Sequence, residues 1–315
     1  MASPSTVGKW LPRYELRVET APGPSTVQNP SGVDTISITL PLTLDFEINR
    51  QFQAQAQTGN FKIKNLNPDD RDLLYKDWMK FLPQRFVQLR AGYPGFTPLI
   101  FNGWVQNAFS YRNAGETDTI TELQCQDGVY QQSLGTPPAQ GVPTVGGVSA
   151  ATYSEILNNI NSALPGSPPS AIIGNFPTTP VRGLALAGST WDVIQTLANG
   201  QATIDNGQLK CMQQDEVFQN AQLPVLNSDS GLLGSPRISN STIEADFLFE
   251  PRVTLGQLIE LQSVTQRVFN GPYKVMGFVH RGTISGAMDG ERITTMTFWK
   301  GTAPFVVIPG NAILQ

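Results

Sequence analysis

The most constraining feature of the chain is a run of strictly alternating apolar and polar residues near its start. In "ISITLPLTLDFEI", residues 36–48, every even-numbered residue is Ile, Leu or Phe, and no odd-numbered residue is. Successive side chains of a β-strand point to opposite faces, so this pattern predicts one buried and one solvated face, over about 40 Å if the strand is unbroken. Pro41 lies on the polar side and has no N–H for a ladder hydrogen bond, which predicts an edge position or a bulge that bends the strand.

Similar alternation recurs on both sides of this run. The stretch "RYELRVE" places Tyr14, Leu16 and Val18 on one face. Further alternating stretches are "FVQLRAGY", "PLIFNGWVQNAFSY" and "DTITELQCQDG", separated by turns that contain Gly, Pro or Asn. About six strands and one helix are therefore expected between residues 10 and 130. An antiparallel sheet that is closed or nearly closed on itself, with the helix packed on one side, is the economical arrangement.

The helix is expected to begin where the period changes within "NFKIKNLNPDDRDLLYKD". Asn67 is an N-cap candidate, and Pro68 suits the first helical position because its missing N–H would have no partner there. The acidic cluster Asp69, Asp70 and Asp72 lies where the helix dipole favours anions, so we interpret it as a helix start rather than as a metal site. The apolar residues that follow at helical spacing are Leu73, Leu74, Trp78 and Phe81.

Residues 134–150, "LGTPPAQGVPTVGGVSA", are rich in Pro and Gly and indicate a domain boundary. Two helices are expected beyond it. The first, in "ATYSEILNNINSALPG", opens with a capping box of Thr152 and Glu155. The second, in "STWDVIQTLANG", has Ser189 as its cap and Gly200 as its C-terminal stop. "PGSPPSAIIGNFPTTPVRG" between them is expected to be a linker, and "IDNGQLKC" a hairpin with a type I′ turn at its Asn-Gly pair. Together they predict a small α+β module.

The last third of the chain returns to strands, in "STIEADFLF", "QLIELQSV", "YKVMGFVHRGTIS" and "ERITTMTFW". This ending resembles the end of the first part. "GWVQNAFSY...GETDTITELQCQ" from Gly103 aligns with "GFVHRGTIS...DGERITTMTFW" from Gly277. The weak internal repeat suggests that the same barrel occurs twice.

Charge and composition exclude some classes of protein. The formal net charge is -4 and the sequence pI is about 5.1, whereas a nucleic-acid-binding protein would carry a basic patch that neutralises phosphates. Only 15% of the residues are charged, against roughly 25% in an ordinary soluble protein. The surface therefore relies on uncharged polar groups, which suits a protein covered by contacts with other subunits.

No set of residues in the sequence indicates catalysis, a cofactor or a metal. Cys125 and Cys211 are in no metal or redox spacing and are expected to be buried thiols. His280 is the only histidine, so a histidine pair for a metal is excluded, and we expect this side chain to be structural or exposed. Trp191 lies at helical spacing from Ile194 and is expected in a core.

No membrane anchor is expected. The N-terminus lacks the charged and apolar segments of a signal peptide, and no run of about 18 apolar residues could span a bilayer. We therefore expect the chain to stay in the cytoplasm until it is assembled.

Several segments, taken in order, carry a family resemblance. They are "NLNPDDRDLLYKD", "VQLRAGYPG", "LIFNGWV" and "TITELQCQDG", then "GSTWDVIQTLAN", then "GLLGSPRI", "ADFLFEPRVTLGQLIELQS" and "NGPYKVMGFVHRG". In this order, over nearly the whole chain, they resemble the baseplate hub protein of contractile-tailed bacteriophages. The resemblance implies a mainly β fold with an α+β insert, in which two tail-tube-like β-barrel domains flank a small α+β module. The implied parts are a first tube-like β-barrel with one helix, a linker with the α+β module, a second tube-like β-barrel and an extended tail, at residues 1–135, 136–228, 229–300 and 301–315.

The resemblance also implies a structural, non-enzymatic function without cofactors. Three copies of a two-barrel chain would present six similar barrels, so a homotrimer could join a hexameric tail tube protein to a trimeric central spike protein. Other baseplate components are further expected partners. DNA would pass through the lumen without specific binding, and the acidic balance suits such a lumen because a basic wall would hold phosphates. The implied location is the baseplate of the virion tail, with assembly in the host cytoplasm.

Two other functions stay open at this point. One is a peptidoglycan-binding or peptidoglycan-degrading tail protein, because "GSTWDVIQTLANG" is similar to sugar-binding modules that bind peptidoglycan. The other is a tube-end protein of a non-contractile phage tail.

The segments expected to contact partners are the tail and one hairpin. The tail, "GTAPFVVIPGNAILQ", is apolar and either straps over its own barrel or docks on a neighbouring subunit. "QFQAQAQTG" is expected to extend a hairpin toward tube or sheath components. The candidate partner-contact residues are Phe305, Val306, Val307 and Ile308 in the tail and Phe52 in the hairpin.

Overall fold

The structure is a computed structural model of the 315-residue chain. It describes residues 11–20, 35–52, 56–76, 79, 85–128, 172–174, 190–198, 200–219, 223–239, 241–286, 290–301 and 304–309. The mainly β fold that the sequence predicts is confirmed, because strands that pair almost entirely antiparallel make up most of these residues.

The first part of the chain forms seven strands and one helix. The order of the strands in the sheet is β3-β4-β7-β6-β5-β1-β2, all antiparallel, so β2 is an edge strand. Every strand expected here is present, and the additional strand arises because the long alternating run is divided into two. The elements are β1 (Arg13–Glu19), β2 (Thr35–Thr39), β3 (Leu44–Gln51), β4 (Gln57–Lys64), α1 (Pro68–Leu74), β5 (Arg85–Gly92), β6 (Leu99–Tyr111) and β7 (Ile120–Asp127).

The alternating run is divided next to Pro41, where the chain turns after the edge strand β2 and re-enters the sheet as β3. The two halves take different partners, since β2 pairs with β1 and β3 pairs with β4. The buried face continues across the break nevertheless. The even-numbered side chains are buried in, or packed against, one core cluster: Ile36, Ile38, Leu40, Leu42, Leu44, Phe46 and Ile48.

Helix α1 begins as the sequence predicts. The Asn67 side chain accepts a hydrogen bond from the Asp70 N–H at 2.9 Å, and Pro68 occupies the first turn. The helix is shorter than its apolar spacing suggested, because it ends at Leu74, whose side chain is buried, while Leu73 is exposed. Trp78 and Phe81 lie outside the described residues.

The last part of the chain forms a second set of strands. The four predicted strands are present, and β12 and β13 are additional ones that the sequence analysis missed. Gly234 and Pro236 interrupt the pattern of β13, and its register against β14 shifts between Leu233 and Arg237. Pro lacks a ladder donor and Gly favours bulges, so such a strand belongs at a sheet edge. The elements are β12 (Val225–Leu226), β13 (Leu232–Ser239), β14 (Thr242–Leu248), β15 (Leu258–Leu261), a 3-10 helix (Arg267–Phe269), β16 (Gly271–Ile284) and β17 (Arg292–Trp299).

The two sets of strands repeat the same order. β3-β4-β7-β6-β5 and β13-β14-β17-β16-β15 have the same succession along the chain, and every neighbouring pair is antiparallel. A register shift occurs at Gln106 in β6 and at Met276 in β16. When the two bulges are superimposed, Val105 corresponds to Val275. The sequence alignment placed Gly103 on Gly277, so it is wrong by four residues. The two hairpins also differ in length, because Tyr111 lies opposite Ile120 whereas its counterpart Arg281 lies opposite Ile293.

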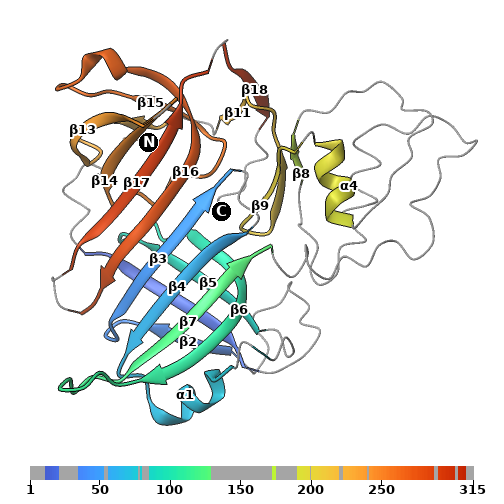
Figure 1. The fold of residues 1–315 in the computed structure, drawn as a ribbon. Coiled ribbons are helices and arrows are strands. Elements are labelled where there is room, and N and C mark those ends of the chain that lie inside the picture. Colours follow the sequence, from blue (N-terminus) through green and yellow to red (C-terminus); the bar gives the residue numbers. More distant parts are fainter. Residues whose placement is uncertain are drawn as a thin grey trace, which may run out of the picture.

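The two repeats join edge to edge within one chain. Residues 277–284 of β16 pair antiparallel with residues 44–51 of β3, so the strands of both repeats form one continuous sheet (Figure 1). Two core clusters lie against it. The first is built almost wholly from strands β1–β7, and the second contains the apolar face of β14 to β17 together with Phe52 and Ile308.

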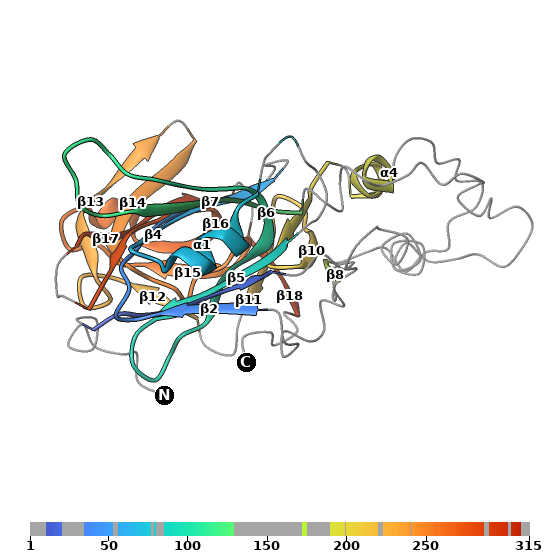
Figure 2. The same ribbon diagram turned by 90° about the horizontal axis from the view of Figure 1, so that it is seen from below.

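A small module lies between the repeats in sequence and at one end of the molecule in space (Figure 2). Its Asn206-Gly207 turn has positive φ at both residues, which confirms the type I′ hairpin, and Gly200 with φ +72° follows the end of α4 as predicted. The expected linker is wrong at one place, because residues 172–174 form a strand that pairs parallel with β10. The elements are β8 (Ile172–Gly174), α4 (Thr190–Leu197), β9 (Ala202–Asp205), β10 (Gln208–Cys211), β11 (Glu216–Gln219) and, near the end of the chain, β18 (Val306–Pro309).

Some predictions fall outside the described residues. They are the capping box at Thr152 and Glu155, the Ser189 cap and the proline-rich boundary at 134–150. The division into four parts at residues 135, 228 and 300 stays a prediction.

Candidate functional site

A buried group of charged side chains lies where the two repeats and the small module meet, and Arg50 is at its centre. Arg50 is an even-numbered residue of β3, so the alternation that buries Ile48 also turns the Arg50 guanidinium inward, where it is 1% exposed. Its Nη1 donates to Asp127 at 3.2 Å and also to Asp205. Its Nη2 donates to the Asn206 side-chain oxygen at 2.6 Å and to the Ile100 carbonyl at 3.3 Å.

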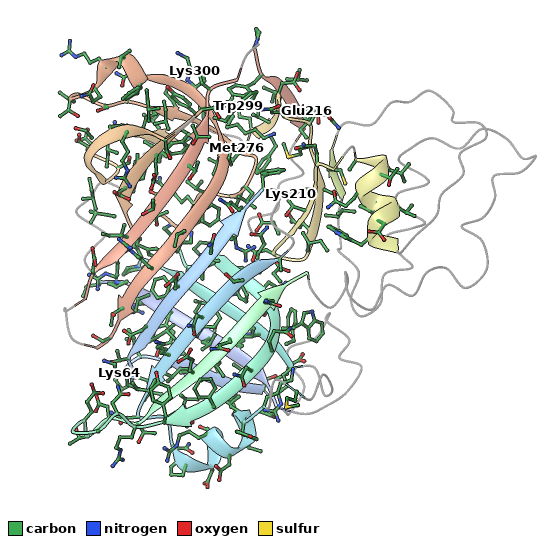
Figure 3. The ribbon with its side chains drawn as sticks, in the orientation of Figure 1. Lys64, Lys210, Glu216, Met276, Trp299 and Lys300 are labelled. Atoms are coloured by element: carbon green, nitrogen blue, oxygen red, sulfur yellow. The ribbon has the colours of Figure 1, made fainter. Side chains whose placement is uncertain are left out.

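Lys210 completes this group from the other side of the β9–β10 hairpin. Its Nζ donates to Asp205 at 2.6 Å and to the Leu255 carbonyl at 3.0 Å, and it lies 5.1 Å from the centre of the Phe218 ring. The Asn206 backbone N–H, in the hairpin turn, donates to Asp127 at 2.7 Å. The turn of this hairpin is therefore hydrogen-bonded to Asp127 at the end of β7. The stem of the hairpin is hydrogen-bonded, through Lys210, to Leu255 of the second repeat. Figure 3 shows Lys210 where the module approaches the large sheet.

Two cations and two carboxylates balance one another in this group, which we call the Arg50 cluster: Arg50, Asp127, Asp205, Asn206 and Lys210. Burial alone would raise the pKa of Asp205, but Lys210 and Arg50 hold it below its ordinary value. Burial raises the pKa of Asp127 to about 7, because the Arg50 charge offsets only part of the desolvation. Charges removed from water are tolerated only when they are paired and hydrogen-bonded, so the cluster favours one relative placement of the three parts.

A second contact joins the module to the second repeat. Lys274 of β16 donates to the carbonyls of Gln213 at 2.7 Å and Gln214 at 3.2 Å. Its Nζ lies 4.9 Å from the centre of the Phe52 ring. Burial lowers the pKa of Lys274 to about 8. The contact attaches the segment before β11 directly to the core of the second repeat.

The tail residues occupy two kinds of position. β18 pairs parallel with β11, and the Val306 N–H donates to the Asp215 carbonyl at 3.0 Å, so the tail packs on its own chain. Val306 and Val307 are 45% and 51% exposed. Phe305 is half-buried, with its ring 5.9 Å from that of Trp299. Ile308 and also Phe52, in the hairpin after β3, are buried in the second core cluster and are not available on the described surface.

The other residues singled out by the sequence have structural environments. His280 is buried, and its Nδ1 lies 2.8 Å from the Thr294 hydroxyl; burial lowers its pKa to about 3, so it is neutral. Asp70 takes part in capping α1. Trp191 is half-buried, whereas Ile194, one helical turn further on, is buried. Cys125 and Cys211 are free and buried, as predicted.

Within the described ranges, no group of three or more His, Cys, Asp and Glu side chains could hold a metal ion. Among the same residues, no helix has the length and apolar character needed to cross a bilayer.

The edge strand β13 is a feature that the sequence analysis missed. β13 ends the described sheet and has β14 as its only neighbour. Beyond Val105, β6 has β7 on one side, and on its other side Lys76 forms a bridge with Ala108 and the end of α1 packs against the strand. The Gly and Pro residues within β13 could have indicated an edge strand in the sequence, because both residue types are typical of edge strands.

Comparison with known proteins agrees with this architecture. A family model described as "Baseplate hub gp41" matches residues 25–280, most of the chain. No curated protein sequence matches the chain. A tail protein from Neisseria meningitidis MC58 has a similar structure, with a TM-score of 0.58 at 12% identity, over 93% of this chain and 98% of that one.

Two more solved structures are similar. The 43 kDa tail protein of prophage MuSo2 from Shewanella oneidensis gives a TM-score of 0.53 at 11% identity, over 91% of this chain and 96% of that one. The E. coli c3393 protein gives a TM-score of 0.51 at 11% identity, over 86% of this chain and 77% of that one. It is described as a component of the type VI secretion system with structural similarity to the T4 bacteriophage tail proteins gp27 and gp5. At these identities the likeness shows a shared fold.

Proposed function

Since the chain belongs to the baseplate hub gp41 family of phage tail proteins, we propose that three copies form a non-enzymatic hub that joins a hexameric tail tube to a trimeric central spike. The channel through this hub lets DNA leave the virion. Assembly takes place in the host cytoplasm, and the hub then resides in the baseplate of the tail.

The repeated strand order is the observation that carries this proposal. One chain holds the succession β3-β4-β7-β6-β5 and the succession β13-β14-β17-β16-β15, with the same bulge in each. Three such chains present six similar units in a ring, so one assembly offers threefold symmetry to one partner and near-sixfold symmetry to the other. A chain with one unit would need six copies and would leave half of the contacts of a trimeric spike unmet.

Rigid joints between the repeats support the same function. The repeats are connected by backbone pairing between β16 and β3 and by the Arg50 cluster, so their relative orientation is determined by hydrogen bonds and ion pairs rather than by a flexible linker. An adaptor that holds a tube and a spike in register needs such joints.

The exposed side of β18 is a proposed contact for a partner. Val306 and Val307 present apolar side chains to solvent on a strand that pairs with β11 on one side. Tube, spike and other baseplate components are the proposed partners of this strand, with Phe305 beside it. The formal charge of -4 suits a channel wall that does not retain the passing phosphates.

The mass in solution tests the proposal. The chain is 34.3 kDa, so light scattering or native mass spectrometry should give a particle of about 103 kDa, three times that mass, and negative-stain images should show rings. A chain that stays monomeric at micromolar concentration would contradict the proposal.

A further inference from the structure

We propose that one face of the continuous sheet lines the channel of the hub, and that carboxylates on this face shield its cations from the phosphates of passing double-stranded DNA. The face consists of the outward side chains of the adjacent strands β14, β17, β16, β3, β4 and β7, together with Arg237 of the neighbouring β13. We call it the polar face. The inference rests on the proposed trimer and names the surface that its channel presents to DNA.

The polar face is continuous across the joint between the two repeats. Asp45 and Glu47 are odd-numbered residues of β3, so they point away from the core that contains Ile48. Glu47 lies opposite Arg281 of β16 on one side and opposite Asn60 of β4 on the other. In Figure 1, β17, β16, β3, β4 and β7 lie in front of the rest of the sheet, and no other described helix or strand covers them. Both repeats therefore contribute to one uncovered face.

The polar face differs from the rest of the described surface in its apolar content. The exposed large apolar side chains of the described residues all come from other elements, and none belongs to the six strands of this face. Exposed apolar groups favour contacts with other proteins, so partner proteins fit the other surfaces and the polar face fits a surface that stays in water. The exposed side chains are Leu11, Leu73, Tyr75, Met79, Phe96, Val225, Leu233, Ile238, Val264, Val268, Val306 and Val307.

In the first repeat, both lysines of the polar face lie beside carboxylates of neighbouring strands. The Lys62 Nζ is 3.8 Å from a Glu122 oxygen, and the Lys64 Nζ is 3.9 Å from an Asp45 oxygen. The Glu122 carboxylate also accepts a hydrogen bond from the Asn60 amide at 3.3 Å. The side chains of Lys62 and Lys64 are 41% and 36% exposed, so both lie within reach of a ligand in the channel.

In the second repeat, Arg237 has two carboxylate partners. Its Nη2 donates to Glu244 at 2.8 Å and its Nη1 donates to Asp246 at 3.0 Å. Arg281, at the joint, has Glu47 directly opposite it. The polar face thus carries five carboxylates and four cations: Asp45, Glu47, Glu122, Glu244 and Asp246, and Lys62, Lys64, Arg237 and Arg281.

This balance suits a wall along which DNA moves. A cation that neutralises a phosphate releases a counterion from the duplex, and each such contact strengthens binding at low salt. A cation that is already paired with a carboxylate gains less from a phosphate, because the existing pair must first separate. A large excess of carboxylates would instead repel the duplex along the whole channel. Paired cations with a small negative excess therefore let DNA pass without holding it.

Retention of linear and circular DNA by the trimer tests the inference. The variant Asn49→Lys, Gln126→Lys adds two cations to the polar face at positions that have no carboxylate directly opposite. A linear duplex can enter a ring from its end, whereas a covalently closed circle cannot. At about 50 mM salt this variant should retain linear duplex at least about tenfold better than circular duplex in size-exclusion chromatography, and wild type should retain neither. The matched control Thr117→Lys, Gln266→Lys adds the same charge at exposed positions off the face and should show no preference for the linear form.

A second variant frees a native cation without adding one. Glu244→Gln, Asp246→Asn removes both carboxylate partners of Arg237 and should also retain linear DNA in preference to circular DNA. Light scattering of each variant measures whether its mass is still that of a trimer. Trimeric variants that retain both forms of DNA equally, or retain neither, would overturn the inference and leave the proposed trimer standing. A monomeric wild-type chain would overturn both.

Discussion

Removal of the buried Arg50 guanidinium should strongly destabilise the protein. The variant Arg50→Met keeps most of the volume of the side chain and removes its charge and its donors. Two carboxylates, an amide oxygen and a carbonyl oxygen then lose a partner at the junction of the three parts.

Breaking a buried ion pair from one side costs about 3–5 kcal/mol. Asp127 has a pKa of about 7 and can take up a proton once Arg50 is gone, which reduces the penalty, so we expect about 3 kcal/mol. For a chain of this size each kcal/mol lowers Tm by about 2 °C, which gives a decrease of roughly 6 °C. The loss of stability in Arg50→Met should be larger at pH 8 than at pH 6, because Asp127 is ionised in the wild-type protein at pH 8.

The assay is thermal and urea unfolding followed by circular dichroism, at one fixed protein concentration because an oligomer melts in a concentration-dependent way. Hydrogen exchange should increase in the β9–β10 hairpin and not in α1, since only the hairpin is bonded to Arg50. The matched control is Arg17→Met, which breaks a partly exposed ion pair with Glu15 and should cost under about 1 kcal/mol.

Arg50→Lys separates charge from geometry. It keeps the cation but cannot contact two carboxylates and an amide in one plane, so its stability should lie between wild type and Arg50→Met. If Arg50→Met is destabilised by less than about 1 kcal/mol, or no more than Arg17→Met, the cluster does not hold the three parts together and the reasoning fails.

Three further outcomes are expected. Asp127→Asn should make the protein lose stability more steeply than wild type as the pH falls from 6.5 to 4, as measured by urea unfolding at a series of pH values; an unchanged slope would contradict the raised pKa of Asp127. Asn67→Ala should cost about 1 kcal/mol by thermal unfolding, because it removes the cap of α1, and no measurable loss would show that the cap is dispensable. Val307→Asp should weaken binding to purified tube or spike protein in a pull-down, while the mass of the free hub stays at three times that of one chain. Undiminished binding would show that β18 is not part of the partner surface.

The direction of the pH effect follows from two opposed groups. Asp127 has a folded pKa of about 7, above its ordinary 3.8, so its contribution to stability is full below pH 3.8 and is lost as the pH rises through 7. His280 has a folded pKa of about 3, below its ordinary 6.5, so its contribution is present above pH 6.5 and is lost as the pH falls. Between pH 6.5 and 3.8 the two slopes oppose each other, and Asp127→Asn leaves only the loss from His280.

Local structure was predictable where a few neighbouring residues decide it. The alternating runs became strands with the predicted faces buried, Asn67 and Pro68 started a helix, and the Asn-Gly pair formed a type I′ turn. Each of these depends on backbone sterics or on a hydrogen bond between residues three or four apart, so the information lies within a short segment. The buried position of Arg50 was also open to prediction, because it continues the parity of the run at 36–48.

The partners of each element depended on the whole fold. Nothing near Pro41 indicates that β2 joins β1 while β3 joins β4 and β16. Asp205 pairs with Arg50 across 155 residues, and Ile238 is exposed although it resembles any core isoleucine. A strand has two edges and two faces, and the local pattern specifies only the faces. Which edge is paired depends on long-range backbone hydrogen bonds that every residue type except proline can form, so strand order, the Arg50 cluster and the free edges were decided only when the chain packed.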